Sequence, residues 1–168
     1  IRGSGYFAAH SVTPDGQITP WADSDLGKLS WKAWWVMAKG AKETRDPELQ
    51  WFAKKYEAEG DTNSGWSVAS VLMYDPTIPA KQPTRVGFTT GQRPDGVSMG
   101  YAFMRTGYTD DAVHVVMRCG DYFGHHNHAD SNAFTIFWKG AEIAKDEGYQ
   151  KGLESKDSSH HNTLSIQG

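Results

Sequence analysis

The sequence predicts an α+β protein in which helices are followed by an antiparallel sheet. Apolar residues recur at helical spacing in residues 1–75, whereas short runs rich in aromatic and β-branched residues dominate residues 86–168. Between these parts, residues 76–85 contain three prolines, which is typical of a linker. Elements segregated in this order along a chain favour the α+β class.

The first candidate helix begins after Ser24 or Asp25. One face of it would carry the residues Leu26, Ser30, Ala33, Trp34 and Met37. This stripe predicts a helix that packs its apolar side inward.

The second candidate helix has the clearest signals for its ends. Asp46 is a suitable N-cap, Pro47 fits the first helical position, and Gly60 stands where a left-handed stop belongs. Its apolar residues at helical spacing are Leu49, Phe52, Ala53 and Tyr56. A short third helix is expected over Trp66 to Met73.

The second part of the chain predicts strands separated by turns. The runs are Met99 to Thr106, Ala112 to Cys119, Ala133 to Trp138 and Thr163 to Ile166. Residues 107–111 and the pair Lys139-Gly140 are expected to form hairpin loops.

Composition narrows the class of protein. The 168 residues carry a formal net charge of −3, so they offer no basic field for nucleic acid, and no apolar run approaches the ~20 residues that cross a bilayer. Cys119 is the only cysteine, which excludes an intrachain disulfide and leaves the redox compartment undecided. The many aromatic rings suit either a core or the stacking of sugars.

Histidines are the most informative residues. Five of the seven stand in two segments, residues 120–130 and 158–163, and Asp146 lies between them. Imidazoles and a carboxylate that converge could bind a divalent metal ion, with zinc as the first candidate. The alternative is a set of solvent-facing loop histidines, and Asp130 and Glu147 are alternative carboxylates whose simpler role is in a cap or turn.

Two further pairs of residues could contact a ligand. In an extended segment, His126 and His128 would share one face, so one could bind metal while the other faces a substrate. Arg105 and Arg118 could bind a sugar carboxylate in a bidentate manner, or could serve as surface or ladder residues of the sheet.

The ordered stretch from Phe103 to Tyr149, followed by H-H-N-T-L, resembles the β-sandwich segment of the heparinase II/III family of polysaccharide lyases. The resemblance covers residues 101–168. The segment T-P-D-G-Q-I-T-P-W-A-D-S-D, residues 13–25, is similar to the end of that family's (α/α) toroid. The resemblance thus implies the end of a toroid followed by an antiparallel β-sandwich, with both parts truncated.

The resemblance also implies a chemistry, the β-elimination of uronate-containing polysaccharides. His126 matches the catalytic histidine on the sandwich side, and His128, Asp146 and His161 match the ligands of a structural zinc. His125 and His160 stand beside two of these residues, so the register of each assignment stays open.

The family's catalytic tyrosine and its partner usually lie well upstream of the P-D-G segment. Tyr6 and His10 stand too close to it, and packing or surface roles are preferred for both. The principal base is therefore expected outside this chain, in the remainder of a parent lyase, and the isolated segment is expected to be inactive.

The resemblance places a glycosaminoglycan such as heparin or heparan sulfate ahead of alginate as substrate, and a periplasmic or secreted location ahead of others. A uronyl C5-epimerase on the same scaffold and a non-catalytic carbohydrate-binding sandwich are alternatives, whereas metal-assisted hydrolysis is required by no sequence feature. Oligomeric state stays open, with a homo-oligomer among the options.

Overall fold

The computed structural model describes residues 1–21, 27–28, 31–57, 66–91, 96, 100–120, 128–146 and 156–163. The chain divides into two compact units, one of residues 1–12 and 28–85 and one of residues 13–27 and 86–168. The division into a helical segment 1–75, a linker 76–85 and a sandwich segment 86–168 stays a prediction. No helix within the described ranges is long and apolar enough to cross a membrane.

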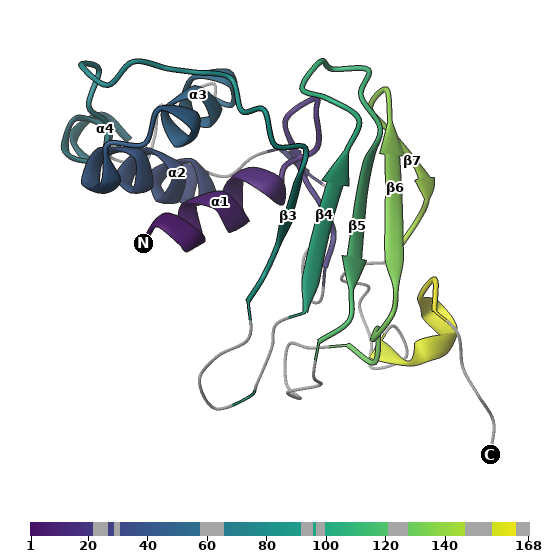
Figure 1. Cartoon of the computed structure of the whole chain (residues 1–168). Coiled ribbons are helices and arrows are strands. Elements are labelled where there is room, and N and C mark those ends of the chain that lie inside the picture. The colour runs from purple at the N-terminus through teal and green to yellow at the C-terminus, as the bar shows by residue number, and fades with distance from the viewer. Residues whose placement is uncertain are drawn as a thin grey trace. The chain divides into compact units, whose positions relative to one another are not determined.

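The first unit contains the described α-helices, which are labelled in Figure 1. They are α1 (Arg2–His10), α2 (Trp31–Thr44), α3 (Pro47–Lys55) and α4 (Trp66–Met73). The start of α3 agrees with the sequence signals, because Oδ1 of Asp46 accepts hydrogen bonds from the backbone N–H of Glu48 and Leu49 at 2.9 and 3.2 Å. Pro47 occupies the first turn as expected.

Helix α2 begins later than its apolar pattern suggests. Its first residue is Trp31, and residues 27–28 are extended, so the helix does not begin after Ser24 or Asp25. Trp34 and Met37 are buried as the pattern predicts. Gly60, the expected stop of α3, lies outside the described residues, and α3 ends before Tyr56.

Helix α1 was not predicted, and its packing explains why it forms. Gly5 allows a close approach to α3, since a Cβ atom placed there would stand 2.9 Å from Cδ1 of Leu49. The Tyr6 hydroxyl donates to Asp46 Oδ2 and Glu48 Oε2, at 3.1 Å each. These contacts come from distant sequence positions, which a local pattern does not record.

The second unit is built on one antiparallel sheet, shown in Figure 1 with its strands side by side in chain order. The strands are β3 (Gly87–Thr89), β4 (Tyr101–Arg105), β5 (His114–Arg118), β6 (Phe134–Trp138) and β7 (Ala141–Ala144). Two shorter strands, β1 (Gln17–Ile18) and β2 (Gly27–Lys28), form a separate ribbon. The predicted α+β order is confirmed.

Three of the four predicted strands correspond to β4, β5 and β6, whereas β3 and β7 were not predicted. Lys139 and Gly140 form the β6–β7 turn with φ values of 51° and 74°, which is the left-handed geometry of a two-residue hairpin. Of the fourth predicted strand, Thr163 is not in a strand and residues 164–166 lie outside the described part of the chain.

Residues 13–21 pack within the sheet unit. Trp21 is 8% exposed, and its ring meets that of Tyr101 edge-on with centroids 5.8 Å apart. Asp15 approaches the β6–β7 turn, because a Cβ atom on Gly140 would stand 3.0 Å from its Oδ2. The aromatic contact explains why part of the segment 1–75 groups with the sheet.

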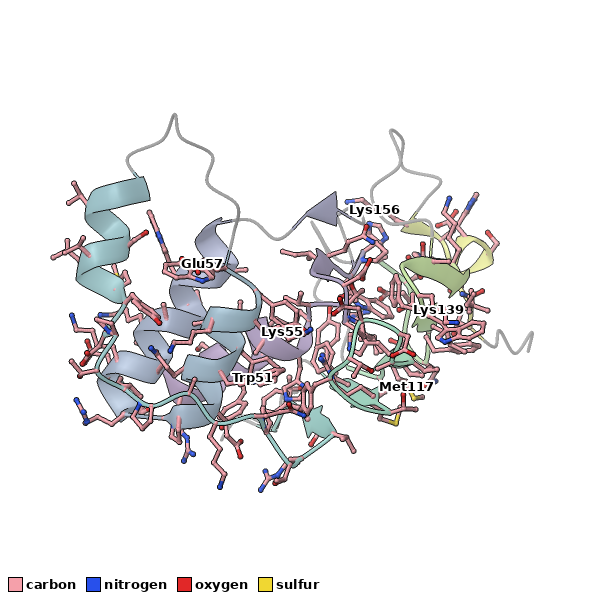
Figure 2. All side chains as sticks on the ribbon, turned by 90° about the horizontal axis from the view of Figure 1, so that it is seen from above. Trp51, Lys55, Glu57, Met117, Lys139 and Lys156 are labelled. Atoms are coloured by element: carbon pink, nitrogen blue, oxygen red, sulfur yellow. The ribbon has the colours of Figure 1, made fainter. Side chains whose placement is uncertain are left out.

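The two faces of the sheet differ in exposure. One face buries Phe103, Val116 and Phe137 together with Arg105, His114 and Arg118. The other face exposes Met104, Phe134, Trp138 and Ile143, and Met117 stands on the same sheet in Figure 2. Lys139 covers part of this second face, with its Nζ 4.8 Å from the ring centroid of Trp138 (Figure 2).

Candidate histidine and carboxylate site

Three of the residues singled out by the sequence lie together in the interior of the sheet unit. The Nδ1 atom of His161 is 2.9 Å from Oδ2 of Asp146, and the rings of His128 and His161 have centroids 5.2 Å apart. All three residues are buried, at 0%, 2% and 8% exposure for His128, Asp146 and His161. His160, the alternative in register, is partly exposed.

A short segment delivers His161 to this position. It begins at residue 156, contains the 3-10 helix η2 (Ser158–His160) and ends at Thr163. Hydrogen bonds tie it to the segment of His128: Ala129 N to Lys156 O at 2.8 Å, Ser158 Oγ to Ala129 O at 2.9 Å and Thr163 Oγ1 to Ser131 O at 2.6 Å. The two histidines are therefore held by backbone contacts as well as by their rings.

Asn162 links the same segment to two strands. Its Nδ2 donates to the carbonyl oxygen of Phe134, at the start of β6, at 3.2 Å, and to that of Lys145, after β7, at 2.7 Å. Lys145 directly precedes Asp146. Asn162 thus fixes His161 and Asp146 relative to each other from the backbone side.

Asp146 follows β7 and has a second carboxylate beside it. The backbone N–H of Asp146 donates to Oε1 of Glu142 at 3.1 Å. Burial raises the pKa of Glu142, the hydrogen bond from Asp146 lowers it, and the charge of Asp146 raises it, with a net rise. Glu142 thereby supports the turn that presents Asp146.

The two arginines predicted to bind substrate are both buried. Arg105 is 5% exposed, with Nη2 3.5 Å from Nε2 of His114 and its guanidinium carbon 5.2 Å from the ring centroid of Tyr108. Arg118 is 2% exposed, forms an ion pair with Asp130 and donates from Nη1 to the carbonyl oxygen of His128 at 3.3 Å. Their assignment as substrate-binding residues stays a prediction.

The other candidates divide into two groups. His125, His126 and Glu147 lie outside the described residues, so the assignment of His126 as catalytic stays a prediction. Tyr6 and His10 belong to the helical unit. Burial and then the charge of Asp46 raise the pKa of Tyr6, and the buried ring of His10 meets that of Phe52 edge-on.

The donor set of the cluster suits a zinc ion in kind. Two imidazoles and one carboxylate are typical zinc ligands, and the buried Nε2 atom of His161 has no hydrogen-bond partner among the described residues. Among the described residues, no group of three or more His, Cys, Asp or Glu side chains stands at metal-binding spacing. The cluster thus matches a zinc site in the chemistry of its donors and in this buried nitrogen, but not in the spacing of the described side chains.

Sequence reasoning missed the residues that support the site, namely Asn162, Glu142 and the pairing of Arg118 with Asp130. One signal was present in the sequence, because an arginine that ends an apolar strand is unusual unless it finds a partner in the interior. The identity of that partner required the fold.

Comparison with known proteins gives a match for the second part of the chain. Residues 89–168 match the family model described as Heparinase II/III-like, C-terminal. No curated protein sequence matches the chain.

Several solved structures share the fold. One is a heparinase III gene product, with a TM-score of 0.64 and 16% identity over 96% of this chain and 23% of that chain. A heparan sulfate lyase HepC mutant from Pedobacter heparinus has a TM-score of 0.62 and 16% identity over 94% and 22%. A heparinase III has a TM-score of 0.61 and 15% identity over 96% and 25%. The chain thus spans about a quarter of the length of these structures.

Proposed function

We propose that this chain, whose residues 89–168 match the heparinase II/III-like family model, is part of a polysaccharide lyase acting on a uronate-containing polysaccharide. The observation that carries the proposal is the meeting of His128, Asp146 and His161, from three separate segments within the matched region. Fold neighbours named heparinase III and heparan sulfate lyase favour a glycosaminoglycan over alginate.

The proposed reaction is β-elimination at the uronate. A base removes the proton from C5, the electron pair of that bond forms the C4–C5 double bond, and the C4–O4 bond breaks as an acid protonates O4. The C5 proton is acidic enough only when the charge that develops on the uronate carboxylate is stabilised. We assign His126 to the active site on the sandwich side, and the principal base to the part of the lyase that precedes this chain.

We further propose that His128, Asp146 and His161 hold a structural zinc ion. Buried neutral imidazoles and a carboxylate are the ligands that zinc takes in proteins, and the buried Nε2 of His161 is an available donor. When bound, the ion would fix the segment of His128 against the segment of His161. Because His126 stands only two residues before His128, this anchoring would also restrict the position of His126. The residues themselves contribute orientation and exclusion of water.

The lyase and its main alternative differ in product. A lyase creates a double bond conjugated to the uronate carboxylate, so ultraviolet absorbance rises with turnover. A C5-epimerase removes the same proton and returns it on the opposite face, which creates no such chromophore. A carbohydrate-binding module would bind substrate without changing it.

We also propose a periplasmic or extracellular location, because uronate-containing polysaccharides occur there.

The test is an assay of the full-length protein with heparan sulfate, heparin and alginate, followed by ultraviolet absorbance and by proton NMR in deuterium oxide. We expect absorbance to grow with heparan sulfate and to disappear in His126→Ala. Incorporation of deuterium at C5 without a rise in ultraviolet absorbance would show that the protein is an epimerase and not a lyase. If the polysaccharide is not changed and still binds the His126→Ala protein, the protein is a carbohydrate-binding module and not an enzyme.

A further inference from the structure

The charged pair of Arg118 and Asp130 lies deeper in the molecule than most ionic groups. Their side chains are 2% and 0% exposed. Removing two charges from water costs several kcal/mol per ion, and the attraction between them offsets this only in a well-formed site. A buried ion pair adds little to the free energy of unfolding compared with apolar residues in the same place, so a role other than stability has to be considered for it.

Arg118 reaches the backbone of the histidine segment. Its Nη1 atom, which pairs with Asp130, also donates to the carbonyl oxygen of His128 at 3.3 Å. The backbone N–H of the same arginine donates to the carbonyl oxygen of Ala133 at 2.9 Å. One residue at the end of β5 thus holds the segment 128–133 near both of its ends.

Asp130 completes the arrangement from the other side. Its carbonyl oxygen accepts from Ala133 N at 2.9 Å, which closes the turn after it, and its carboxylate faces Arg118. The residue between Asp130 and His128, Ala129, donates to the carbonyl oxygen of Lys156, a residue labelled in Figure 2. The backbone of His128 is thereby tied both to β5 and to the segment that carries His161.

We propose that Arg118 and Asp130 are positioning residues whose buried ion pair fixes the backbone of His128 and so places its imidazole beside His161. This inference rests on the proposed zinc site. It gives Arg118 a role inside the protein in place of a contact with substrate. Arginine suits this role because its guanidinium has several donors in a planar fork, whereas a lysine offers one compact charge.

The decisive variant removes both charges together. In a single Arg118→Met or Asp130→Leu protein one charge would stay buried without its partner, and the fold could be lost for that reason alone. The double variant Arg118→Met/Asp130→Leu replaces the pair by apolar side chains and is expected to fold. It also removes the donor to the His128 carbonyl, so positioning is separated from stability.

Zinc affinity is the first measurement, made by competition with a chromophoric chelator. In the double variant we expect a loss of at least about tenfold, as for other residues that orient metal ligands, and a changed visible spectrum of the cobalt-loaded protein. Arg118→Lys should lie between the double variant and the unaltered protein. Val116→Ala is the matched control, because it opens a cavity on the same strand without touching the histidine segment.

Amide hydrogen exchange supplies a second measurement that does not involve metal. The N–H groups of Ala129 and Ala133 should exchange at least about tenfold faster in the double variant than in Val116→Ala, because both N–H groups belong to the segment that Arg118 holds. If the unaltered protein binds no zinc, the proposed metal site fails and exchange alone decides the positioning role. A folded double variant with unchanged exchange, or with unchanged zinc affinity where zinc binds, would overturn the inference.

Discussion

The Nδ1 atom of His161 and Oδ2 of Asp146 lie 2.9 Å apart, and their side chains are 0% and 1% exposed. A carboxylate at this distance fixes the orientation of the imidazole ring and, with it, the direction of Nε2. The pair joins two segments separated by 15 positions in the sequence.

Removing one ligand of the proposed zinc set should remove the metal. We expect about one zinc ion per chain in the purified protein and none in Asp146→Ala or His128→Ala, measured by elemental analysis after dialysis. Asp157→Ala is the control, because this carboxylate is exposed and makes no side-chain cap bond to η2. Zinc retained by both ligand variants would contradict the assignment.

Asn162→Ala should loosen the segment that carries His161. The change leaves the carbonyl groups of Phe134 and Lys145 without a donor that now lies at 3.2 and 2.7 Å. Both hydrogen bonds are exposed, so water can replace the amide as donor, and the expected loss is about 0.5–1.5 kcal/mol for each bond. Urea unfolding should show this loss, whereas the exposed Ser159→Ala should match the unaltered protein.

Gly100→Ala should destabilise the backbone of residues 119–120, which follow strand β5. Gly100 has φ of +58°, and a Cβ atom there would collide with the backbone of Cys119 and Gly120. A loss of at least about 1–3 kcal/mol in the free energy of unfolding is expected from the strained backbone alone. Gly107→Ala is the control, since a Cβ atom there meets nothing within 4 Å. Equal stabilities of the two variants would refute the packing.

Asp46→Ala should shorten or destabilise α3. The carboxylate accepts from the N–H groups of Glu48 and Leu49 and pairs with Arg2 at 2.8 Å. Loss of an N-cap of this type costs about 1 kcal/mol. Asp46→Asn keeps an acceptor and should retain most of the stability, as measured by thermal unfolding.

The same carboxylate should make stability depend on pH. Burial raises the pKa of Asp46, but hydrogen bonds from Leu49, Arg2 and Glu48 outweigh it, so the pKa lies below 3.8. The unfolded chain therefore binds the proton first, and the contribution is complete above the unfolded pKa and lost as pH falls through the lower folded one. Between pH 6 and pH 2, the free energy of unfolding should therefore fall less in Asp46→Asn than in the unaltered protein.

Elements with strong local signals were predicted well. Asp46 and Pro47 define the start of α3 through bonds within one turn, and the run of apolar and β-branched residues in 112–119 predicts β5 from its own composition. Both signals depend on neighbours only a few positions away. For that reason they can be read before the fold is known.

Elements that depend on distant partners were missed. Helix α1 contains glycine and few apolar residues, and it is stabilised by Leu49, Asp46 and Glu48. Strand β7 has only four residues and takes its register from β6 through a bulge. Short elements of this kind owe their existence to packing and pairing rather than to propensity.

By itself the sequence determined the α+β order, the α3 cap, the strands β4 to β6 and the match of residues 89–168 to the heparinase II/III-like family model. It also supplied the histidines and Asp146 as candidates. Only the tertiary structure decided that His161 lies against Asp146 and that Arg118 turns inward to Asp130 and the His128 carbonyl. Helix caps and strand-forming runs depend on residues that are near neighbours in the sequence. The partner of a buried side chain depends on which distant segments the fold brings together.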